Sequence, residues 1–246
     1  MAASANAFAQ TSAKDSLRVV NLQEVQVVST RATSKTPVAY SNISQKEIQK
    51  QNFGLDLPFL LTATPSVLTT SDAGSGVGYT SIRVRGTDAT RINITANGIA
   101  MNDAESHSIF WVNTPDLASS LEDMQIQRGA GTSTNGAGAF GASINLRTAG
   151  IPSKAYAEVS GSYGSFNTHK ETVRVGSGLL GNHWAFDTRI SNIQSDGYRD
   201  RATSDLKSYF LQGGYYGENT TLKLIAFGGK EKTCLLYTSP SPRDPK

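Results

Sequence analysis

The sequence predicts an α+β fold, in which a small mixed α/β domain is followed by an incomplete antiparallel β-barrel. Three observations support this prediction. Hydrophobic residues make up 38% of the 246 residues, a low share for a compact soluble protein. Charged residues make up 17%, a low share for a disordered chain. Capped helical segments occupy the first part of the chain. Five stretches of alternating apolar and polar residues then follow from residue 155.

Several classes of function are disfavoured by composition. The net charge of +3 forms no basic stripe, so nucleic acid is not an expected partner. The sequence has no run of 18 apolar residues, so no membrane-spanning helix is predicted. Membrane-spanning strands are not excluded by this, because they give only a weak alternating pattern. The single cysteine, Cys234, excludes an internal disulfide. No Ser-His-Asp or paired-carboxylate arrangement can be argued from the spacing. We therefore expect no enzyme, no cofactor and no metal.

The N-terminal segment is typical of an exported protein. "MAASANAFAQ" resembles the end of a signal peptide cleaved before Gln10, although a disordered Ala/Ser terminus is the alternative. Residues 10–36 are polar apart from "LQEVQVVST" at 22–30. This β-prone segment in a flexible tether is a candidate for strand addition to the sheet edge of another protein. The alternative is an ordinary edge strand of the following domain.

Three helices are predicted between residues 37 and 150. "SQKE" is a capping box, which predicts a helix from Ser44 to about Gln51. Asp56 and Pro58 open a second short helix that ends near Leu61. In "TPDLASSLED", at residues 114–123, a threonine precedes a proline and an aspartate, the pattern of a capped third helix.

Four strands are predicted in the same region, at residues 81–86, 91–99, 124–129 and 142–148, with a turn at Asn97-Gly98. The glycine-rich stretch "RGAGTSTNGAGAFGASINLRT" at 128–148 could be a phosphate-binding loop or a structural loop in a confined space. No Gly-Lys-Ser/Thr follows the glycines, and a strand follows where a phosphate loop needs a helix. The structural interpretation is therefore favoured.

The five alternating stretches begin at residues 155, 170, 184, 208 and 221, and each has about nine or ten residues, the length of a tilted membrane-spanning strand. Tight connections, "LGNH" and "GENT", alternate with the longer polar connections "GSFNTH" and "QSDGYRDRATSDLK". Outer-membrane barrels have this asymmetry. A soluble β-sandwich is the alternative.

The order of these parts resembles a TonB-dependent outer-membrane receptor. "LQEVQVVST" is similar to the TonB box and its flank, and "TPSV", "IRVRG", "ITANGIAMND" and "MQIQRGAGTSTNGAGAFGASINLRT" follow the plug pattern of that family in order. The resemblance covers roughly residues 22–232. It implies a signal-peptide remnant at 1–9, a tether at 10–36, a plug domain at 37–150 and the start of a transmembrane barrel at 151–233.

The resemblance also implies roles for particular residues. The family's barrel has about 22 strands, of which this chain would supply about five. The coupling segment for a TonB-type inner-membrane protein would consist of Glu24, Val25, Gln26, Val27 and Val28. Two arginines that end plug strands, Arg85 and Arg128, would pair with glutamates on the inner barrel wall, since guanidinium binds carboxylate through two parallel hydrogen bonds. The alternative for both is a solvated arginine on a polar sheet face.

Two loops are candidate ligand-contact regions. "DAESHSIFW" at 103–111 and "TTSDAGSGVGY" at 69–79 would lie at the apex of the plug, where aromatic and polar side chains could contact an incoming ligand. The candidate contact residues are Ser106, His107, Phe110, Trp111 and Tyr79. In the first loop, Asp103, Glu105 and His107 alternate and could ligate a metal from one strand face, but polar loop residues are the simpler interpretation.

The expected function is that of an N-terminal fragment of an active transporter in the bacterial outer membrane. It would take up a scarce nutrient or metal chelate, such as an iron-siderophore or cobalamin, while in contact with outer-membrane lipid. The alternative is a soluble secreted β-rich binding protein or adhesin. Five strands cannot close a barrel, because an open sheet edge in lipid leaves unpaired backbone groups. The alternating pattern ends before "CLLYTSPSPRDPK" at 234–246. We therefore interpret this tail as an artefact, and the alternative is a genuine Pro/Ser-rich loop.

Overall fold

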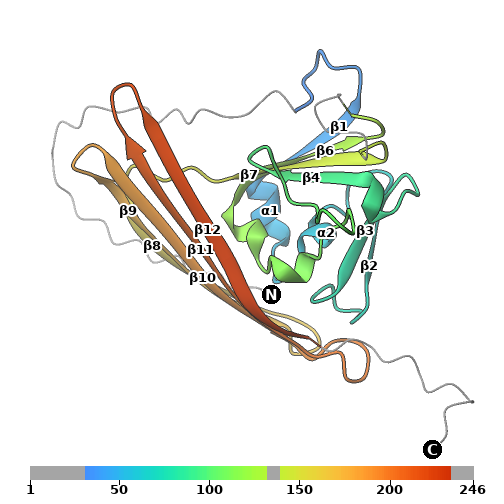
Figure 1. The fold of residues 1–246 in the computed structure, drawn as a ribbon. Coiled ribbons are helices and arrows are strands. Elements are labelled where there is room, and N and C mark those ends of the chain that lie inside the picture. Colours follow the sequence, from blue (N-terminus) through green and yellow to red (C-terminus); the bar gives the residue numbers. More distant parts are fainter. Residues whose placement is uncertain (1–30, 132–138, 234–246) are drawn as a thin grey trace, which may run out of the picture.

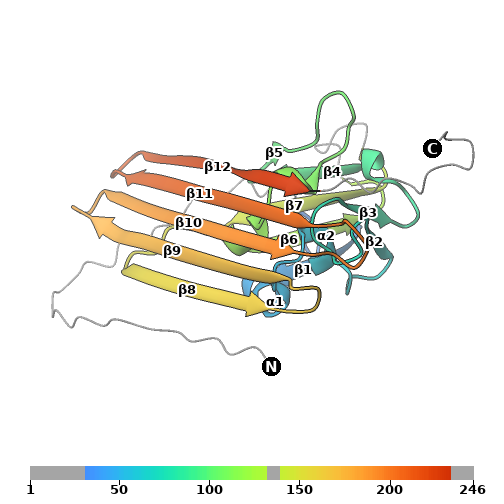
Figure 2. The same ribbon diagram turned by 90° about the horizontal axis from the view of Figure 1, so that it is seen from below.

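The computed structural model of the chain describes residues 31–131 and 139–233, which form two packed parts (Figure 1). The first part, residues 31–148, is called the N-terminal domain and combines strands with short helices. The second part, strands β8 to β12 at residues 155–233, is called the wall sheet and runs along one side of the N-terminal domain (Figures 1 and 2). This arrangement confirms the predicted fold class. The sheet is open along its length and closes no barrel within the described residues.

The N-terminal domain is built on a five-stranded sheet with the order β1-β6-β7-β4-β5. Strands β4 and β7 are parallel, and the other neighbouring pairs are antiparallel. The bounds of the five strands are β1 Ala39–Ser44, β4 Ile92–Ala96, β5 Ile99–Ala100, β6 Leu121–Arg128 and β7 Ala142–Thr148. A separate antiparallel pair consists of β2 Val67–Ser71 and β3 Thr80–Val84.

The first two predicted helices are confirmed as α1 Gln45–Gln51 and α2 Leu57–Leu60. The backbone N–H of Ser44 donates to Glu47 Oε2 over 2.7 Å, as a capping box requires. A proline in the first turn of α2 removes an N–H that would have no helical partner. The turn at Asn97 and Gly98 is also confirmed, because both residues have positive φ angles of 50° and 85°.

The third predicted helix is wrong. Only one 3₁₀ turn forms there, η3 Leu117–Ser120, and β6 begins directly after it at Leu121. Asp116 has a φ of 54°, so the backbone turns into the left-handed region where an α-helix would start. Pairing of Leu121 and Asp123 with β7 gives these residues sheet hydrogen bonds, which outweigh a local helical preference. Two further 3₁₀ turns are η1 Ala89–Arg91 and η2 Trp111–Asn113.

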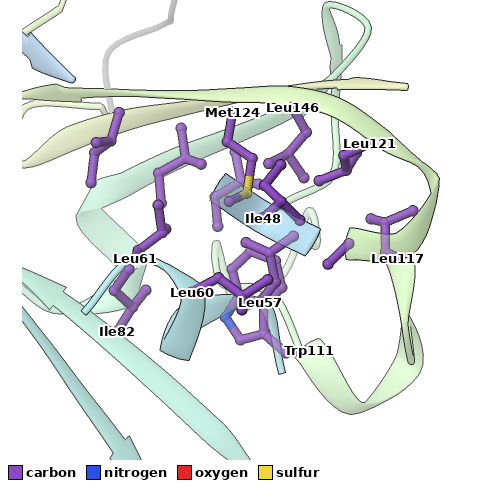
Figure 3. Packing of buried hydrophobic residues seen from close by; sticks show 14 of the residues in the cluster. Ile48, Leu57, Leu60, Leu61, Ile82, Trp111, Leu117, Leu121, Met124 and Leu146 are labelled. Atoms are coloured by element: carbon purple, nitrogen blue, oxygen red, sulfur yellow. The ribbon is translucent and has the colours of Figure 1, made fainter. Parts of the chain in front are cut away.

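The hydrophobic core lies between the five-stranded sheet and the helices (Figure 3). Ile48 of α1 and Leu60 of α2 pack toward Met124 and Leu146 of the sheet. Phe210 of the wall sheet belongs to the same cluster and is fully buried. The N-terminal domain therefore shares part of its core with the wall against which it lies.

The wall sheet is an antiparallel meander in which each strand pairs with its neighbours in the chain. The bounds of its strands are β8 Ala155–Tyr163, β9 His169–Leu180, β10 Trp184–Ser195, β11 Ser204–Tyr216 and β12 Thr221–Thr233. Four of them have 12 or 13 residues, longer than predicted, because they extend into polar segments that the sequence assigned to connections. The connections 181–183 and 217–220 lie at one end of the sheet, and 164–168 and 196–203 lie at the other.

The two faces of the wall sheet differ in chemistry. Along β10, Phe186 and Ile190 are exposed on the outer face, while Asp187, Arg189 and Ser191 are buried against the N-terminal domain. An apolar outer face and a polar inner face are typical of outer-membrane strands. Among the residues that the structure describes, no helix is long and apolar enough to cross a membrane.

Glycines in the stretch at 128–148 allow segments of the backbone to approach one another closely. The N–H of Gly129 donates to the carbonyl of Gly141 over 2.9 Å, and the N–H of Gly141 donates to the carbonyl of Arg91 over 3.0 Å. A Cβ atom at Gly141 would lie 2.9 Å from that same Arg91 oxygen. A side chain there would collide with backbone, so glycine serves packing at this position.

Candidate functional site

A buried ionic cluster joins the N-terminal domain to the wall sheet, and Asp116 lies at its centre. Its side chain is 1% exposed and faces β9 and β10. Asp116 Oδ1 lies 2.6 Å from Lys170 Nζ, and Oδ2 lies 2.5 Å from Arg189 NH1. Ser191 Oγ donates to Oδ2, and Ser119 Oγ of the N-terminal domain donates to Oδ1 over 2.6 Å. One carboxylate is thus held by two cations and two hydroxyls.

The local backbone aims Asp116 at the wall. A left-handed conformation is uncommon for residues other than glycine, but aspartate and asparagine adopt it more readily than most. Arg189 NH1 also donates to the backbone carbonyl of Asp116, so one guanidinium binds both the main chain and the side chain. These contacts to Arg189 stabilise the left-handed conformation of Asp116, with which the predicted helix is incompatible.

The electrostatics of the cluster favour the ionised carboxylate. Burial by itself would raise the pKa of Asp116, but the ammonium of Lys170 and the guanidinium of Arg189 outweigh it and lower the pKa to about 2. Asp116 is therefore charged at any physiological pH. Removing one member of such a buried group leaves the others without compensation, which is strongly destabilising.

A second polar cluster lies within the wall sheet, around Asp187. Its carboxylate accepts hydrogen bonds from Arg174 NH2 over 2.8 Å, from Gln212 Nε2 over 3.0 Å and from the hydroxyl of Tyr156. The four side chains come from β8, β9, β10 and β11, so the cluster ties together most of the inner face. It holds the wall in shape, whereas the Asp116 cluster joins the wall to the domain.

The loop at residues 72–79 contacts the opposite end of the wall sheet from the short connections 181–183 and 217–220. The backbone N–H groups of Tyr198 and Arg199, in the connection 196–203, both donate to the carbonyl of Ala73. Below the loop, Asp56 is buried and accepts from Thr80 Oγ1 over 2.8 Å. Burial raises the pKa of Asp56 to about 7, and its hydrogen bonds only partly oppose that shift.

A cavity of about 590 Å³ lies between α1 and the inner face of β8 and β9. Its lining is mostly polar and carries five cationic side chains against one carboxylate, that of Glu158. The cationic residues are Lys46, Lys50, Lys170, Arg174 and Arg189. The cavity extends the polar character of the Asp116 cluster along the interface.

The two arginines that were predicted to join the plug to the barrel wall lie outside the Asp116 cluster. Arg85 is exposed and has a φ of 52°, and Arg128 NH1 donates to the carbonyl of Pro65 over 3.3 Å. Their pairing with glutamates of the wall stays a prediction. The interface cluster that the structure describes has the opposite polarity, with the acid on the N-terminal domain and the bases on the wall.

The predicted ligand-contact residues are divided between surface and core. Ser106, His107 and Phe110 lie in the loop between β5 and η2, where His107 and Phe110 are exposed, and Tyr79 is half-buried beside the wall. Trp111 is a correction, since its side chain is 3% exposed and packs in the core (Figure 3). An indole enclosed by leucines and isoleucines is not available to a ligand.

The remaining site predictions have different outcomes. The alternating acids and histidine at 103–107 belong to a loop and not to a strand, because the carboxylate of Asp103 accepts from the backbone N–H of Ser106. No group of three or more His, Cys, Asp or Glu in the described ranges could hold a metal ion. The coupling segment, Glu24 to Val28, lies outside the described residues.

Asp116, Lys170 and Arg189 were not predicted from the sequence as a group. Charged residues on the inner side of alternating strands were visible in "KETVRVG" and "WAFDTRISN", where lysine and arginine share a face with threonine and serine. Buried cations need a counter-charge, so this pattern indicates an acid in the preceding domain. Which acid supplied it could not be read from spacing.

Comparisons with known proteins agree on one family. The model of the TonB-dependent receptor plug domain matches residues 32–143. A vitamin B12 transporter of Vibrio vulnificus, BtuB, is 26% identical over 203 residues, which is 78% of this chain and 32% of the relative.

Solved structures share the fold at low sequence identity. The ferripyoverdine receptor of Pseudomonas aeruginosa matches with a TM-score of 0.66 and 15% identity, over 82% of this chain and 27% of that receptor. The siderophore receptor PirA of Acinetobacter baumannii matches with a TM-score of 0.62 and 16% identity, over 78% and 31%. The chain spans about a third of the length of these relatives, and the match extends from the N-terminal domain into the wall strands.

Proposed function

This chain belongs to the TonB-dependent outer-membrane receptors, and from that premise we propose that it takes part in energy-coupled uptake of a scarce nutrient. The N-terminal domain is the plug and the wall sheet is part of the barrel. The family is one of transport receptors and not of enzymes, and its location is the bacterial outer membrane.

The observation that carries this proposal is the interface between the plug and the wall. Much of the contact consists of charged and hydroxyl groups, with Asp116 bound by Lys170, Arg189 and Ser191. Hydrogen bonds of this kind can be exchanged for bonds to water at a modest net free-energy difference. A plug held in this way is firmly placed at rest, and its departure would expose these polar groups together with the apolar contacts at Phe210, Ile193 and Leu206.

Energy for that movement has to arrive mechanically, because the outer membrane has no nucleotide supply. Residues 22–30 suit the role of a coupling segment, since a valine-rich strand in a polar tether can add to the sheet of an inner-membrane partner. The residues that would pair are Glu24, Val25, Gln26, Val27 and Val28. Pulling on this segment would act on the plug through residue 31 and the chain that follows it.

The transported nutrient is proposed only as a class. The relatives are named for vitamin B12, for siderophores and, in one solved structure with a TM-score of 0.63, for copper. A cobalamin or a metal chelate is therefore the class that we propose for this receptor. Exposed Phe110 and His107, together with half-buried Tyr79 and Ser106, are proposed as contacts from the plug.

Proline substitutions in the coupling segment test the proposal. In the full-length receptor, Val25→Pro and Val27→Pro should abolish uptake while ligand binding is retained, because proline removes a backbone donor needed for strand addition. Binding and uptake are measured with a panel of cobalamins and ferric chelates on intact cells. Ser12→Pro, in the same tether but outside the segment, is the control and should transport normally. Normal uptake by both valine variants would contradict the assignment.

A further inference from the structure

The side chain of Asp116 occupies a site whose other members belong largely to the wall. Lys170 Nζ, Arg189 NH1 and Ser191 Oγ all lie within hydrogen-bonding distance of the carboxylate, and Thr172 Oγ1 lies 3.5 Å from Oδ2. All four groups come from β9 and β10. The plug contributes the anion, the hydroxyl of Ser119 and the side-chain amide of Asn52, whose Nδ2 lies 3.5 Å from Oδ1.

The wall groups are organised among themselves as well as toward the plug. Thr172 Oγ1 and Ser191 Oγ lie 3.0 Å apart, and Arg189 NH1 donates to Ser191 Oγ over 3.2 Å. These residues project from paired positions of two neighbouring strands, because Thr172 is the register partner of Ser191. A sheet is a rigid support, so the donors should keep their positions when the carboxylate is withdrawn.

Charge gives the site its ligand class. Two cations meet one carboxylate, so the wall side carries two positive charges whenever Asp116 is absent. In addition, Arg189 Nε is buried and has no hydrogen-bond partner in the part of the chain that the structure describes, which leaves the guanidinium with unused donor capacity. While the plug still covers them, unpaired cations are costly, and a free anion of matching shape removes that cost.

We propose that the inner wall carries a carboxylate-binding site, which Asp116 fills while the plug is docked and which a free carboxylate can take when Asp116 is withdrawn. The site consists of Lys170, Arg189, Ser191 and Thr172. If the proposed transport function holds, the site suits a cargo that bears a carboxylate, because displacement of the plug would uncover it along the wall.

Chemical rescue by small carboxylates tests the site in the resting full-length receptor in detergent micelles. Asp116→Gly removes a methylene and a carboxylate, which together have the shape of acetate, and glycine accepts the φ of 54°. The variant should melt at a lower temperature than the unmodified receptor. Acetate, but not chloride at equal ionic strength, should restore most of the loss, with half-maximal recovery at about 10 mM because a free ion must also lose its translational freedom.

Matched variants separate site occupancy from general salt effects. Asp116→Asn keeps the shape of the side chain, so it should be destabilised and unresponsive to acetate. Asp116→Gly combined with Arg189→Met removes a cation of the site and should lose the response. Asp116→Ala leaves room for formate rather than acetate and should reverse the preference between the two ions.

If Asp116→Gly fails to refold in chloride, its refolding yield in acetate is compared with that in chloride instead. Equal effects of acetate and chloride, or equal recovery of all four variants, would overturn the site. The measurement needs no uptake, so its failure would leave the transport proposal standing. Failure of the proline experiment would likewise leave the wall site standing.

Discussion

Two buried aspartates of the N-terminal domain, Asp116 and Asp56, differ in the charge that they carry. Asp116 has an ionised, fully enclosed carboxylate with a pKa of about 2. Asp56 is equally enclosed, but no cation among the described residues lies beside it, and its pKa is about 7. The difference follows from neighbours and not from burial. Asp116 therefore anchors the plug at every physiological pH, and Asp56 changes its charge within the physiological range.

The pH dependence of stability should reveal Asp56. Its folded pKa is raised above the unfolded value of 3.8, so its contribution is fully present below about pH 4 and is lost as pH rises through about 7. The unfolding free energy should fall by up to about 4 kcal/mol over that interval. Asp56→Asn keeps an acceptor for Thr80 and cannot ionise, so it should lack this loss.

Denaturant titrations of both proteins from pH 4 to pH 8 provide the comparison. The variant should be the more stable protein at pH 8. If the two stability curves ran parallel across the whole range, burial of an ionisable Asp56 would not be the cause.

Neighbouring aromatics at the end of the 103–111 loop should separate ligand binding from folding. Phe110 is 50% exposed, and Trp111 is 3% exposed. Phe110→Ala should weaken ligand binding with little change in melting temperature. Trp111→Ala should cost about 3 to 5 kcal/mol of stability, as large-to-small core changes do. Equilibrium binding and thermal unfolding are measured for both. Strong unfolding by Phe110→Ala with unchanged affinity would instead make Phe110 an anchor of the plug.

At the scale of elements, alternation along the wall strands decides which face meets lipid. Leu211 of β11 points outward at mid-strand beside Thr188 of β10, within the apolar band of the outer face. Ser160 of β8 points to the other side, into the interface cavity. The same strand pattern thus presents two environments that differ greatly in their tolerance of charge.

Charged substitutions at these two positions should have unequal effects. Leu211→Lys should destabilise the inserted barrel by about 2 to 4 kcal/mol, the cost of a cation at the lipid face near the midplane. Ser160→Glu, the control, should cost much less because the cavity is lined by five cationic side chains and one carboxylate. Urea unfolding from lipid vesicles gives both values. Equal costs at the two positions would contradict the assignment of the outer face.

At the scale of the whole molecule, the wall sheet has two free edges among the described residues, β8 and β12. Each edge presents N–H and C=O groups without sheet partners, and each such group costs several kcal/mol in a bilayer. Five strands also enclose too small a circumference to hold the plug, since barrels of about eight strands already fill with side chains.

Residues 155–233 expressed alone should therefore fail to insert as a compact barrel and should aggregate through the edge strands. Heat-modifiability on a gel after refolding, together with size exclusion, measures this outcome. A heat-sensitive compact band from a monodisperse monomer would show that the strands form a self-contained sheet, and would favour the soluble sandwich.

The sequence by itself determined the fold class, the first two helices, the Asn97-Gly98 turn and the alternation of the wall strands. These features depend on local chemistry, namely capping residues, turn residues and a side-chain period of two. The order of the motifs also identified the family, because their sequence along the chain is specific even where each motif is weak.

Only the tertiary structure decided that the third predicted helix does not form, that Trp111 is buried, and that Asp116 pairs with Lys170 and Arg189. Each depends on contacts between segments far apart in the chain, since more than 50 residues separate Asp116 from either cation. A buried charge takes whichever counter-charge the packed fold brings within about 3 Å, and the desolvation that enforces the pairing exists only after packing. Local pattern cannot encode that choice, so the docking residue of the plug became visible only in three dimensions.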